Sequence, residues 1–343
     1  MTPRPSTWQA SETVGSAHVA GSDPAPVLRS ETSTDWEGNH NKMPVKVHLD
    51  PDLLWQAAGK TVIITGGANG IGAATAALYN RHGASVVIAD LPAAQPAADT
   101  LIPTLSHPDR AMFVPTNILD WAQMTRLFKQ AKERFGPIDI VVANAAIMET
   151  APVLDLDAVN ENGELLESQE AFRVIDVNIK GTLNTLRLAM HHMRSSGGSV
   201  VMLASTSGYF GGTGVAAYVT SKHGVVGLMR ACQAAAAKHG IRVNAVAPFF
   251  TPTHITASYA ANWKDAGLEA NTPEGVATVI VQTSLDEGSG KCTLACGSFL
   301  RELEGPRTEF MPEWVGKDVT SLMAEAGKLF ESLGGYPLPK KSH

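Results

Sequence analysis

From residue 60 onward, short apolar and β-branched runs alternate with longer segments of helical periodicity. The apolar runs predict strands at 61–65, 85–90, 111–115, 138–143, 199–204, 241–246 and 292–295. The intervening segments predict helices around 70–82, 120–135, 168–195, 216–239, 273–284 and 316–333. Nearly continuous apolar runs are typical of strands in a parallel sheet that is covered on both faces. The pattern therefore predicts an α/β fold, a single-domain, doubly wound, Rossmann-like parallel sheet in three layers with right-handed crossovers.

The two ends of the chain have a different pattern. Residues 1–45 are rich in Ser, Thr, Pro, Gly and Ala and have no lasting period, which predicts a disordered extension. A more hydrophobic run begins at Met43, so one hypothesis is that residues 1–42 are dispensable. We expect a dinucleotide-binding catalytic domain over 46–300 and a C-terminal helical tail over 301–343. The tail is amphipathic around 314–333 and is expected to cap the pocket or a neighbouring subunit, while 253–271 is expected to form a helical lid.

Composition excludes several classes of protein. The 343 residues are 44% hydrophobic and 17% charged, which is typical of a soluble globular chain. A net charge of -6 without a dense basic block argues against a nucleic-acid partner. Every apolar run is far shorter than a membrane span needs, so no membrane partner is expected. Three cysteines and no secretory signal indicate a reducing, cytoplasmic location, and the cysteines and histidines form no pattern of metal ligands.

Polar and special residues follow several of the predicted strands. Asp90, Asn144, Ser205 and Pro248 all fall at or just beyond the carboxyl end of a strand. In a doubly wound sheet these ends meet at one edge, and ligands bind in the crevice beside them. The sequence therefore predicts a ligand site at this edge.

A glycine-rich stretch, Thr65-Gly-Gly-Ala-Asn-Gly-Ile-Gly72, follows the first predicted strand and begins an Ala-rich helix. Gly66, Gly70 and Gly72 permit a tight turn and leave amide donors for a pyrophosphate, with Asn69 and Ile71 in the same turn. Glycine clusters also occur in ordinary tight turns. The position between a strand and a helix favours a dinucleotide site.

Asp90 ends the second strand, eighteen residues after Gly72. A carboxylate at this place can accept hydrogen bonds from both adenine-ribose hydroxyls and would repel a 2′-phosphate. Neither residues 68–72 nor the residues directly after Asp90 include an Arg or Lys that would receive such a phosphate. The predicted cofactor is NAD; the alternative is that Asp90 is only a solvated carboxylate.

Tyr218 and Lys222 are four residues apart on a predicted helix, and Ser205 lies thirteen residues before the tyrosine. Residues at this spacing share one face of a helix. A neighbouring ammonium favours a phenolate, and a serine hydroxyl can hold a substrate oxygen beside it, as acid-base chemistry on an alcohol or ketone requires. Without the glycine turn, the pair would be better interpreted as a packed aromatic ring beside a solvated charge.

Taken together, the motifs of this chain resemble the motif set of the short-chain dehydrogenase/reductase family, and they occur in the right order over about residues 58–300. They are Thr65-Gly66-x-x-x-Gly70-Ile71-Gly72, Asn144-Ala145-Ala146, Asn178, Ser205 and Tyr218-x-x-x-Lys222. Within it the chain looks like NAD-dependent 15-hydroxyprostaglandin dehydrogenase-like members and fungal secondary-metabolite members. The resemblance implies an NAD-dependent oxidoreductase that interconverts a secondary alcohol and a ketone. It also implies a homodimer or homotetramer that pairs through helices near 168–195 and 216–239.

The resemblance implies roles for further residues. Asn178 is the expected proton-relay residue linked to Lys222, and the remaining expected cofactor contacts are Asn117 and Ile118 at the adenine, Asn144 and Ala145 behind the nicotinamide, and Pro248, Thr251 and Thr253 near the carboxamide. Three residues depart from the family pattern: Asn117 replaces aspartate, and Ala146 and Phe249 replace glycines. Phe249 either displaces its loop or forms an aromatic pocket with Phe250.

The expected substrate is a small, uncharged, apolar or aromatic alcohol, including secondary-metabolite compounds. The candidate pocket residues are Met148, Glu149, Tyr209, Phe249, Phe250 and His254. The acidic segment 155–170 is interpreted as a solvated loop, with a contact at the pocket rim as the alternative. Two other functions stay open: a redox-neutral enzyme such as a dehydratase, epimerase or cyclase, and a cofactor-binding protein without catalysis.

Overall fold

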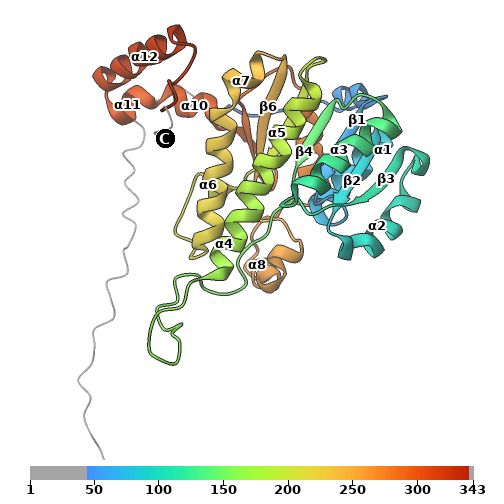
Figure 1. The fold of residues 1–343 in the computed structure, drawn as a ribbon, viewed down its shortest axis with the longest axis horizontal. Coiled ribbons are helices and arrows are strands. Elements are labelled where there is room, and N and C mark those ends of the chain that lie inside the picture. The colour runs from blue at the N-terminus through green and yellow to red at the C-terminus, as the bar shows by residue number, and fades with distance from the viewer. Residues whose placement is uncertain (1–44, 340–343) are drawn as a thin grey trace, which may run out of the picture. The chain divides into compact units, whose positions relative to one another are not determined.

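The computed structural model describes residues 45–339, and the predictions for residues 1–44 lie outside this range. Within it, eight strands form one sheet in the order β3-β2-β1-β4-β5-β6-β7-β8, parallel except for the antiparallel last pair (Figure 1). The strands are β1 (Thr61–Thr65), β2 (Ser85–Asp90), β3 (Ala111–Pro115), β4 (Ile140–Ala143), β5 (Gly198–Leu203), β6 (Ile241–Pro248), β7 (Cys292–Cys296) and β8 (Phe299–Glu302). The predicted parallel, doubly wound sheet is confirmed, and β8 is an addition to it.

The helices cover both faces of the sheet. One face carries α3 (Trp121–Phe135), α5 (Thr182–Met193), α6 (Ala216–Ala231) and α7 (Gln233–Ala237), and α4 (Gln169–Ile175) packs against α6. The other carries α1 (Gly70–Arg81), α2 (Gln95–Leu101) and α9 (Pro273–Leu285). The other α-helices of the described residues are α8 (Ala260–Asp265), which precedes α9, and α10 (Glu304–Glu309), α11 (Met311–Val315) and α12 (Lys317–Ser332), which follow β8.

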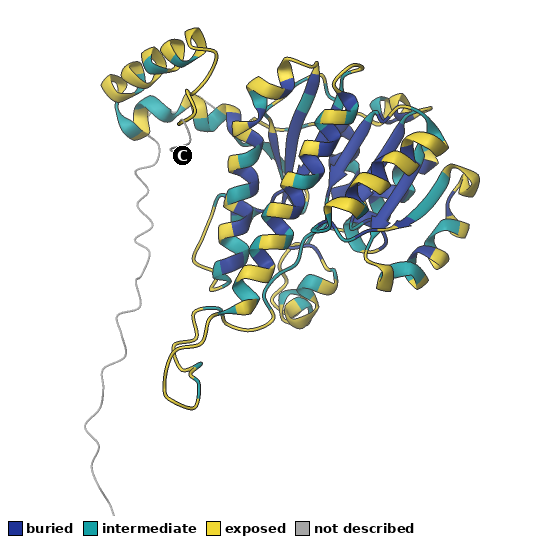
Figure 2. Ribbon diagram, in the orientation of Figure 1, coloured by how far each residue is buried: buried dark blue, intermediate teal, exposed yellow. Residues whose placement is uncertain are grey.

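Alternate residues of each central strand point into opposite layers. In β1, Ile63 joins the core under α3, α5 and α6, while Val62 and Ile64 join the core under α1 and α9. All three are completely buried, which explains the unbroken apolar run in the sequence. Figure 2 shows the sheet buried between helices whose outer faces are exposed.

One predicted helix is interrupted. The segment expected as a single helix over 168–195 forms α4, a π-helical turn over Asp176–Gly181, and α5. A π turn rotates the following residues and is frequently found at functional sites. Here the interruption contains Asn178, which is 1% exposed.

The predicted division of the chain at residue 300 stays a prediction. Strand β8 spans this position, and the residues after it continue into α10. The amphipathic helix expected near 316–333 is present as α12, and none of its residues is buried. None of the described residues after 300 lines the main cleft, so the tail does not cap that cleft within one chain.

Candidate active site

A cleft with a volume of about 770 Å³ lies at the carboxyl ends of the parallel strands. Residues from the ends of β1, β2, β4, β5 and β6 line it, as do the first turn of α1 and the segment 253–263. Every residue predicted for the cofactor or the chemistry lines this cleft except Asn178. The fold therefore collects the sequence motifs into one site.

The glycine turn after β1 is packed too tightly for side chains. Gly66 has a φ of +63°, and a Cβ built on it would lie 2.8 Å from the Cα of Ala145. A Cβ on Gly72 would overlap the carbonyl oxygen of Gly66. The Nδ2 of Asn144 donates to the carbonyl oxygens of Thr65 and Gly66, at 3.0 and 2.9 Å. These contacts hold β1, β4 and the start of α1 together and explain why only glycine fits here.

The first turn of α1 is open to the cleft. Its N-cap residue, Asn69, makes no side-chain capping hydrogen bond. The first amides of a helix have no partner inside it, and their dipoles favour an anion. Gly70, Ile71 and Gly72 line the cleft at this point, so the turn fits the pyrophosphate of a dinucleotide.

Asp90 is held in place at the end of β2. Its Oδ2 accepts a hydrogen bond from the Ala68 amide at 3.1 Å, and its Oδ1 accepts one from the Leu91 amide at 2.8 Å. Each carboxylate oxygen keeps further acceptor capacity for a ribose hydroxyl. The side chain is thus oriented by the backbone of the glycine turn and lines the cleft beside it.

Asn117 and Ile118 border the same end of the cleft. The Oδ1 of Asn117 accepts a hydrogen bond from the Leu119 amide at 3.0 Å, which closes a local turn and leaves its Nδ2 as the free donor of the amide. Ile118 is 8% exposed and packs against Gly181 in the π turn. An apolar wall and one amide donor are suited to an adenine ring.

The three residues predicted as a catalytic triplet, Ser205, Tyr218 and Lys222, line the same cleft, and their catalytic role stays a prediction. Ser205 follows β5, is 8% exposed, and lies close enough to the Tyr218 phenol to lower the pKa of that phenol. The Lys222 ammonium lies 5.5 Å from the centre of the Tyr218 ring and donates to the carbonyl oxygen of Leu203 at 2.7 Å. Lys222 is 3% exposed, and its ammonium keeps two other donors. Both hydroxyls and the ammonium line the cleft.

The acidity of these groups differs from expectation. Burial raises the pKa of the Tyr218 phenol to about 12; the hydrogen bond from Ser205 lowers it, and the charges of Tyr259 and Glu149 raise it. Burial lowers the pKa of Lys222 to about 8. The sequence predicted that Lys222 lowers the pKa of the phenol. The net pKa of Tyr218 is instead raised, because burial disfavours charge on both residues.

Asn178 does not line the cleft, and its side chain is held by three hydrogen bonds. Its Oδ1 accepts from the Ile147 amide at 2.9 Å, and its Nδ2 donates to the Ile147 carbonyl at 2.8 Å and to Ser221 Oγ at 2.9 Å. Both Nδ2 hydrogens are therefore used. The side chain joins the loop after β4 to α6, the helix that carries Tyr218. Its relay role stays a prediction.

Phe249 does not displace its loop. Its amide donates to the carbonyl of Ala295 at 2.8 Å, which continues the pairing of β6 with β7. The ring lies 5.2 Å from the ring of Trp263, edge to face, and Phe250 stacks on Trp263 at 4.3 Å. Tyr259 contacts Phe250 at 5.4 Å. All four rings line the cleft.

Tyr259 and Trp263 were not predicted as pocket residues. They lie in a segment with no strand pattern, which was expected only to form a helical lid.

The two threonines after Pro248 have structural partners. Thr251 is 4% exposed, and its Oγ1 donates to the Phe249 carbonyl and accepts from Asn271 Nδ2, both at 3.1 Å. Thr253 caps the short helix 254–259 through a capping box with Thr256. Both line the cleft, as do Met148 and His254 among the predicted pocket residues.

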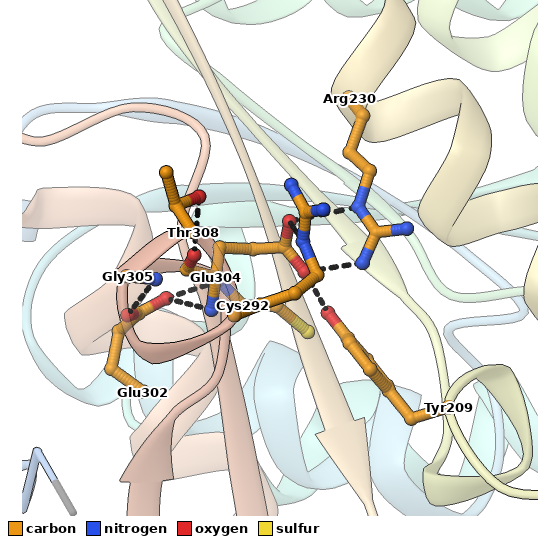
Figure 3. Close-up of polar contacts among 8 residues, drawn as sticks. Tyr209, Arg230, Cys292, Glu302, Glu304, Gly305 and Thr308 are labelled. Atoms are coloured by element: carbon orange, nitrogen blue, oxygen red, sulfur yellow. Dashed lines mark hydrogen bonds and ion pairs between the residues drawn. The ribbon is translucent and has the colours of Figure 1, made fainter. Parts of the chain in front are cut away.

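Two predicted pocket residues lie elsewhere. Glu149 binds the first amides of α6 and does not line the cleft. Tyr209 does not line the cleft either, and it donates to Glu304 Oε1 at 2.7 Å, a contact drawn in Figure 3. Sequence could not reveal either partner, because they are 68 to 95 residues away. The glycine-rich span that contains Tyr209 still borders the site through Thr206, Ser207 and Thr213.

Glu304, which is 8% exposed, is the centre of the polar group drawn in Figure 3. Arg230 donates to both of its oxygens, at 2.8 and 2.7 Å, and Arg307 donates to Oε2 at 3.1 Å. Burial raises the pKa of Glu304, but the hydrogen bonds from Arg230 and Tyr209 outweigh it and the net pKa is lowered. The group ties α10 to α6 and to the loop that follows Ser205.

Other classes of site receive no support from the described part of the chain. Residues 45–339 contain no group of three or more His, Cys, Asp or Glu side chains placed to hold a metal. No described helix is both long and apolar enough to cross a membrane.

Fold and site define a nucleotide-dependent oxidoreductase, and sequence comparison gives the family. A profile of the short-chain dehydrogenases matches residues 60–264, and the chain belongs to the short-chain dehydrogenase/reductase family. These enzymes bind a nicotinamide nucleotide and act on alcohols or ketones of small molecules.

Relatives and a solved structure agree with this assignment. The short-chain dehydrogenase/reductase prx4 of Penicillium roqueforti is 32% identical over 286 residues, which cover 77% of this chain and 82% of that protein. The cis-4-hydroxycyclohexanecarboxylate dehydrogenase of Sinomonas cyclohexanicum is 35% identical over 64% of this chain and 83% of that protein. A crystal structure of a short-chain type dehydrogenase/reductase from Mycobacterium marinum superposes with a TM-score of 0.61 at 28% identity, covering 71% of this chain and 96% of that one.

Proposed function

We propose that this protein is an NAD-dependent dehydrogenase or reductase that interconverts a secondary alcohol and a ketone. The observation that carries the proposal is the position of Tyr218, which lines the same cleft as Ser205, Lys222 and the glycine turn. The bound nicotinamide would accept or donate the hydride. Tyr218 would transfer the proton of the substrate oxygen, and Ser205 would hold that oxygen and stabilise its developing charge.

Asp90 supports NAD as the cofactor. Its carboxylate is fixed by the amides of Ala68 and Leu91, so it cannot easily turn away from a 2′-phosphate. No Lys or Arg lies in residues 68–72 or directly after Asp90 to offset that repulsion. NADP would therefore bind more weakly than NAD.

The aromatic wall supports an apolar or aromatic substrate. Phe249, Phe250, Tyr259 and Trp263 border the cleft near Ser205 and Tyr218. Such rings add favourable contacts with a planar or cyclic apolar body. The name of the Sinomonas relative describes a ring-borne alcohol, which agrees with a cyclic secondary alcohol as the substrate class.

The proposal is tested by following reduced-nicotinamide absorbance with NAD or NADP and a panel of cyclic, aromatic and aliphatic secondary alcohols. We expect turnover with NAD and a cyclic or aromatic alcohol. In Asp90→Ala, the ratio of kcat/KM with NAD to kcat/KM with NADP should fall about tenfold or more, because the substitution removes the carboxylate that would repel the 2′-phosphate of NADP. Tight cofactor binding without any absorbance change would instead favour a non-catalytic protein. Product formation at constant absorbance would favour a redox-neutral enzyme.

A further inference from the structure

The helix that carries Tyr218 is capped from a distant part of the chain. Val215, the N-cap residue of α6, makes no side-chain capping hydrogen bond. Instead Glu149 accepts hydrogen bonds from the amides of Ala217 and Tyr218, through Oε1 and Oε2, each at 3.0 Å. A carboxylate is favourable at this end of a helix, where it satisfies unpaired amides and opposes the helix dipole. The second of these amides belongs to the catalytic tyrosine itself.

The loop that presents Glu149 is held on both sides. Before it, the Ala145 amide donates to Thr65 Oγ1 at 3.2 Å, and Ile147 bonds Asn178 through both its amide and its carbonyl. After it, the Thr150 amide donates to Glu170 Oε1 at 2.7 Å. The carboxylate is therefore fixed relative to β1 and the π turn. Through it, the position of Tyr218 depends on the same loop that lines the cofactor end of the cleft.

The charge of Glu149 also acts on the phenol. The groups that face Tyr218 are Ser205 after β5, Lys222 on α6 and Tyr259 from the segment after β6, and the cleft also contains Arg173 and His254. Of these neighbours, Ser205 lowers the pKa of the phenol, whereas the charges of Glu149 and Tyr259 raise it. A negative charge beside a group that becomes negative disfavours its ionisation.

We propose that Glu149 is a positioning residue of the active site: its carboxylate fixes the backbone of Tyr218 and places a negative charge at the end of the helix that carries this residue. The inference about the charge rests on the proposed function of Tyr218 as proton donor and acceptor, whereas the inference about the backbone does not. Two measurements separate these parts.

The first measurement is hydrogen exchange of the Ala217 and Tyr218 amides in the full chain. Glu149→Ala removes both acceptors, so we expect these amides to exchange about tenfold faster or more, while Glu149→Gln keeps one acceptor oxygen and has a smaller effect. Glu164→Gln is the matched control, because it removes one exposed negative charge from the neighbouring acidic segment without contact to α6. Unchanged exchange in Glu149→Ala would overturn the backbone part.

The second measurement is the pH dependence of kcat for alcohol oxidation. Oxidation needs the phenolate, so activity rises as Tyr218 loses its proton. Glu149→Gln removes a neighbouring negative charge, which favours the phenolate, and the rising limb should move to lower pH by about half a unit or more. Glu164→Gln should leave the limb in place. A limb that stays fixed in Glu149→Gln while the rate falls equally at every pH would overturn the charge part.

The hydrogen-exchange measurement tests the backbone part even if the proposed function is wrong. A wild-type protein that shows no hydride transfer with any substrate would refute the redox assignment, yet the exchange rates would still decide whether Glu149 holds the tyrosine's backbone. A thermal melt of each variant identifies loss of folding. If Glu149→Ala folds, slower exchange in Glu149→Asp than in Glu149→Ala supports the proposal. If Glu149→Ala does not fold, Glu149→Gln is compared with the wild-type protein, and unchanged exchange in Glu149→Gln overturns the backbone part.

Discussion

The two ends of the cleft are built in different ways. At the proposed cofactor end, the site is made by the backbone: Gly66 and Gly72 pack against Ala145 and each other, and the first turn of α1 lines the cleft. At the substrate end, the site is made by side chains from distant segments, such as the rings of Phe249 and Trp263. A backbone site suits the pyrophosphate that every dinucleotide has, whereas a site made of side chains can vary with the substrate.

This contrast predicts that mutations at the two ends have different effects. Changes at the glycine turn should weaken cofactor binding for every substrate. Changes among the aromatic rings should alter the choice of substrate and leave the cofactor bound. Tyr218 lines the same cleft, and loss of its phenol should stop the reaction without affecting either binding event.

The largest effect is expected from Tyr218→Phe. Removing the phenol oxygen removes the proton donor and acceptor, so kcat should fall by about 10²–10⁴ while NAD still binds. Tyr259→Phe removes the same atom from another ring of the cleft and should change kcat little. Steady-state kinetics and fluorescence titration of the cofactor measure both quantities. Comparable losses in the two variants would contradict the assignment.

A smaller but substantial effect is expected from Gly72→Ala. The added methyl group overlaps the Gly66 carbonyl, so the turn must shift. We expect the free energy of unfolding to fall by about 1–3 kcal/mol, and the Kd for NAD to rise with it. Gly227→Ala on α6 is the control, because no atom lies within 4 Å of its new methyl group. Equal effects in the two variants, measured by denaturation and titration, would show that the turn is not constrained.

The network around Glu304 tests whether the C-terminal segment supports the substrate end. Glu304→Gln leaves Arg230 without its carboxylate, and we expect a loss of about 2 kcal/mol in the free energy of unfolding. The Kd for NAD should not change. Glu331→Gln on the exposed helix α12 should be neutral in urea denaturation. A normal stability for Glu304→Gln would mean that α10 is not anchored through this group.

The smallest effect is expected from Phe249→Ala. Losing one ring contact costs about 0.5–1.5 kcal/mol, so KM for an aromatic alcohol should rise several-fold while KM for a small aliphatic alcohol changes little. Phe299→Ala on β8 removes a ring that does not line the cleft and serves as the control. An equal rise for both alcohols would place the aromatic wall outside the substrate contacts.

The same contrast explains what could be predicted from sequence. The strand pattern, the glycine turn and the Tyr218–Lys222 spacing are local features, and the sheet and the cofactor end follow from them. The capping of α6 by Glu149 and the pairing of Tyr209 with Glu304 join segments 68 to 95 residues apart, and no local pattern records them. The acidity of Tyr218 was also missed, because spacing shows which charge is near but not how deeply the group is buried.

The central claim is that Tyr218 and Ser205 together hold the substrate oxygen beside the nicotinamide. The most direct test is a crystal structure with NADH and an unreactive analogue of an aromatic ketone. The account predicts that the analogue's oxygen lies at about 3 Å from both Tyr218 Oη and Ser205 Oγ, with its ring against Phe249 and Trp263. An oxygen bound away from both hydroxyls, with the ring outside the aromatic wall, would contradict it.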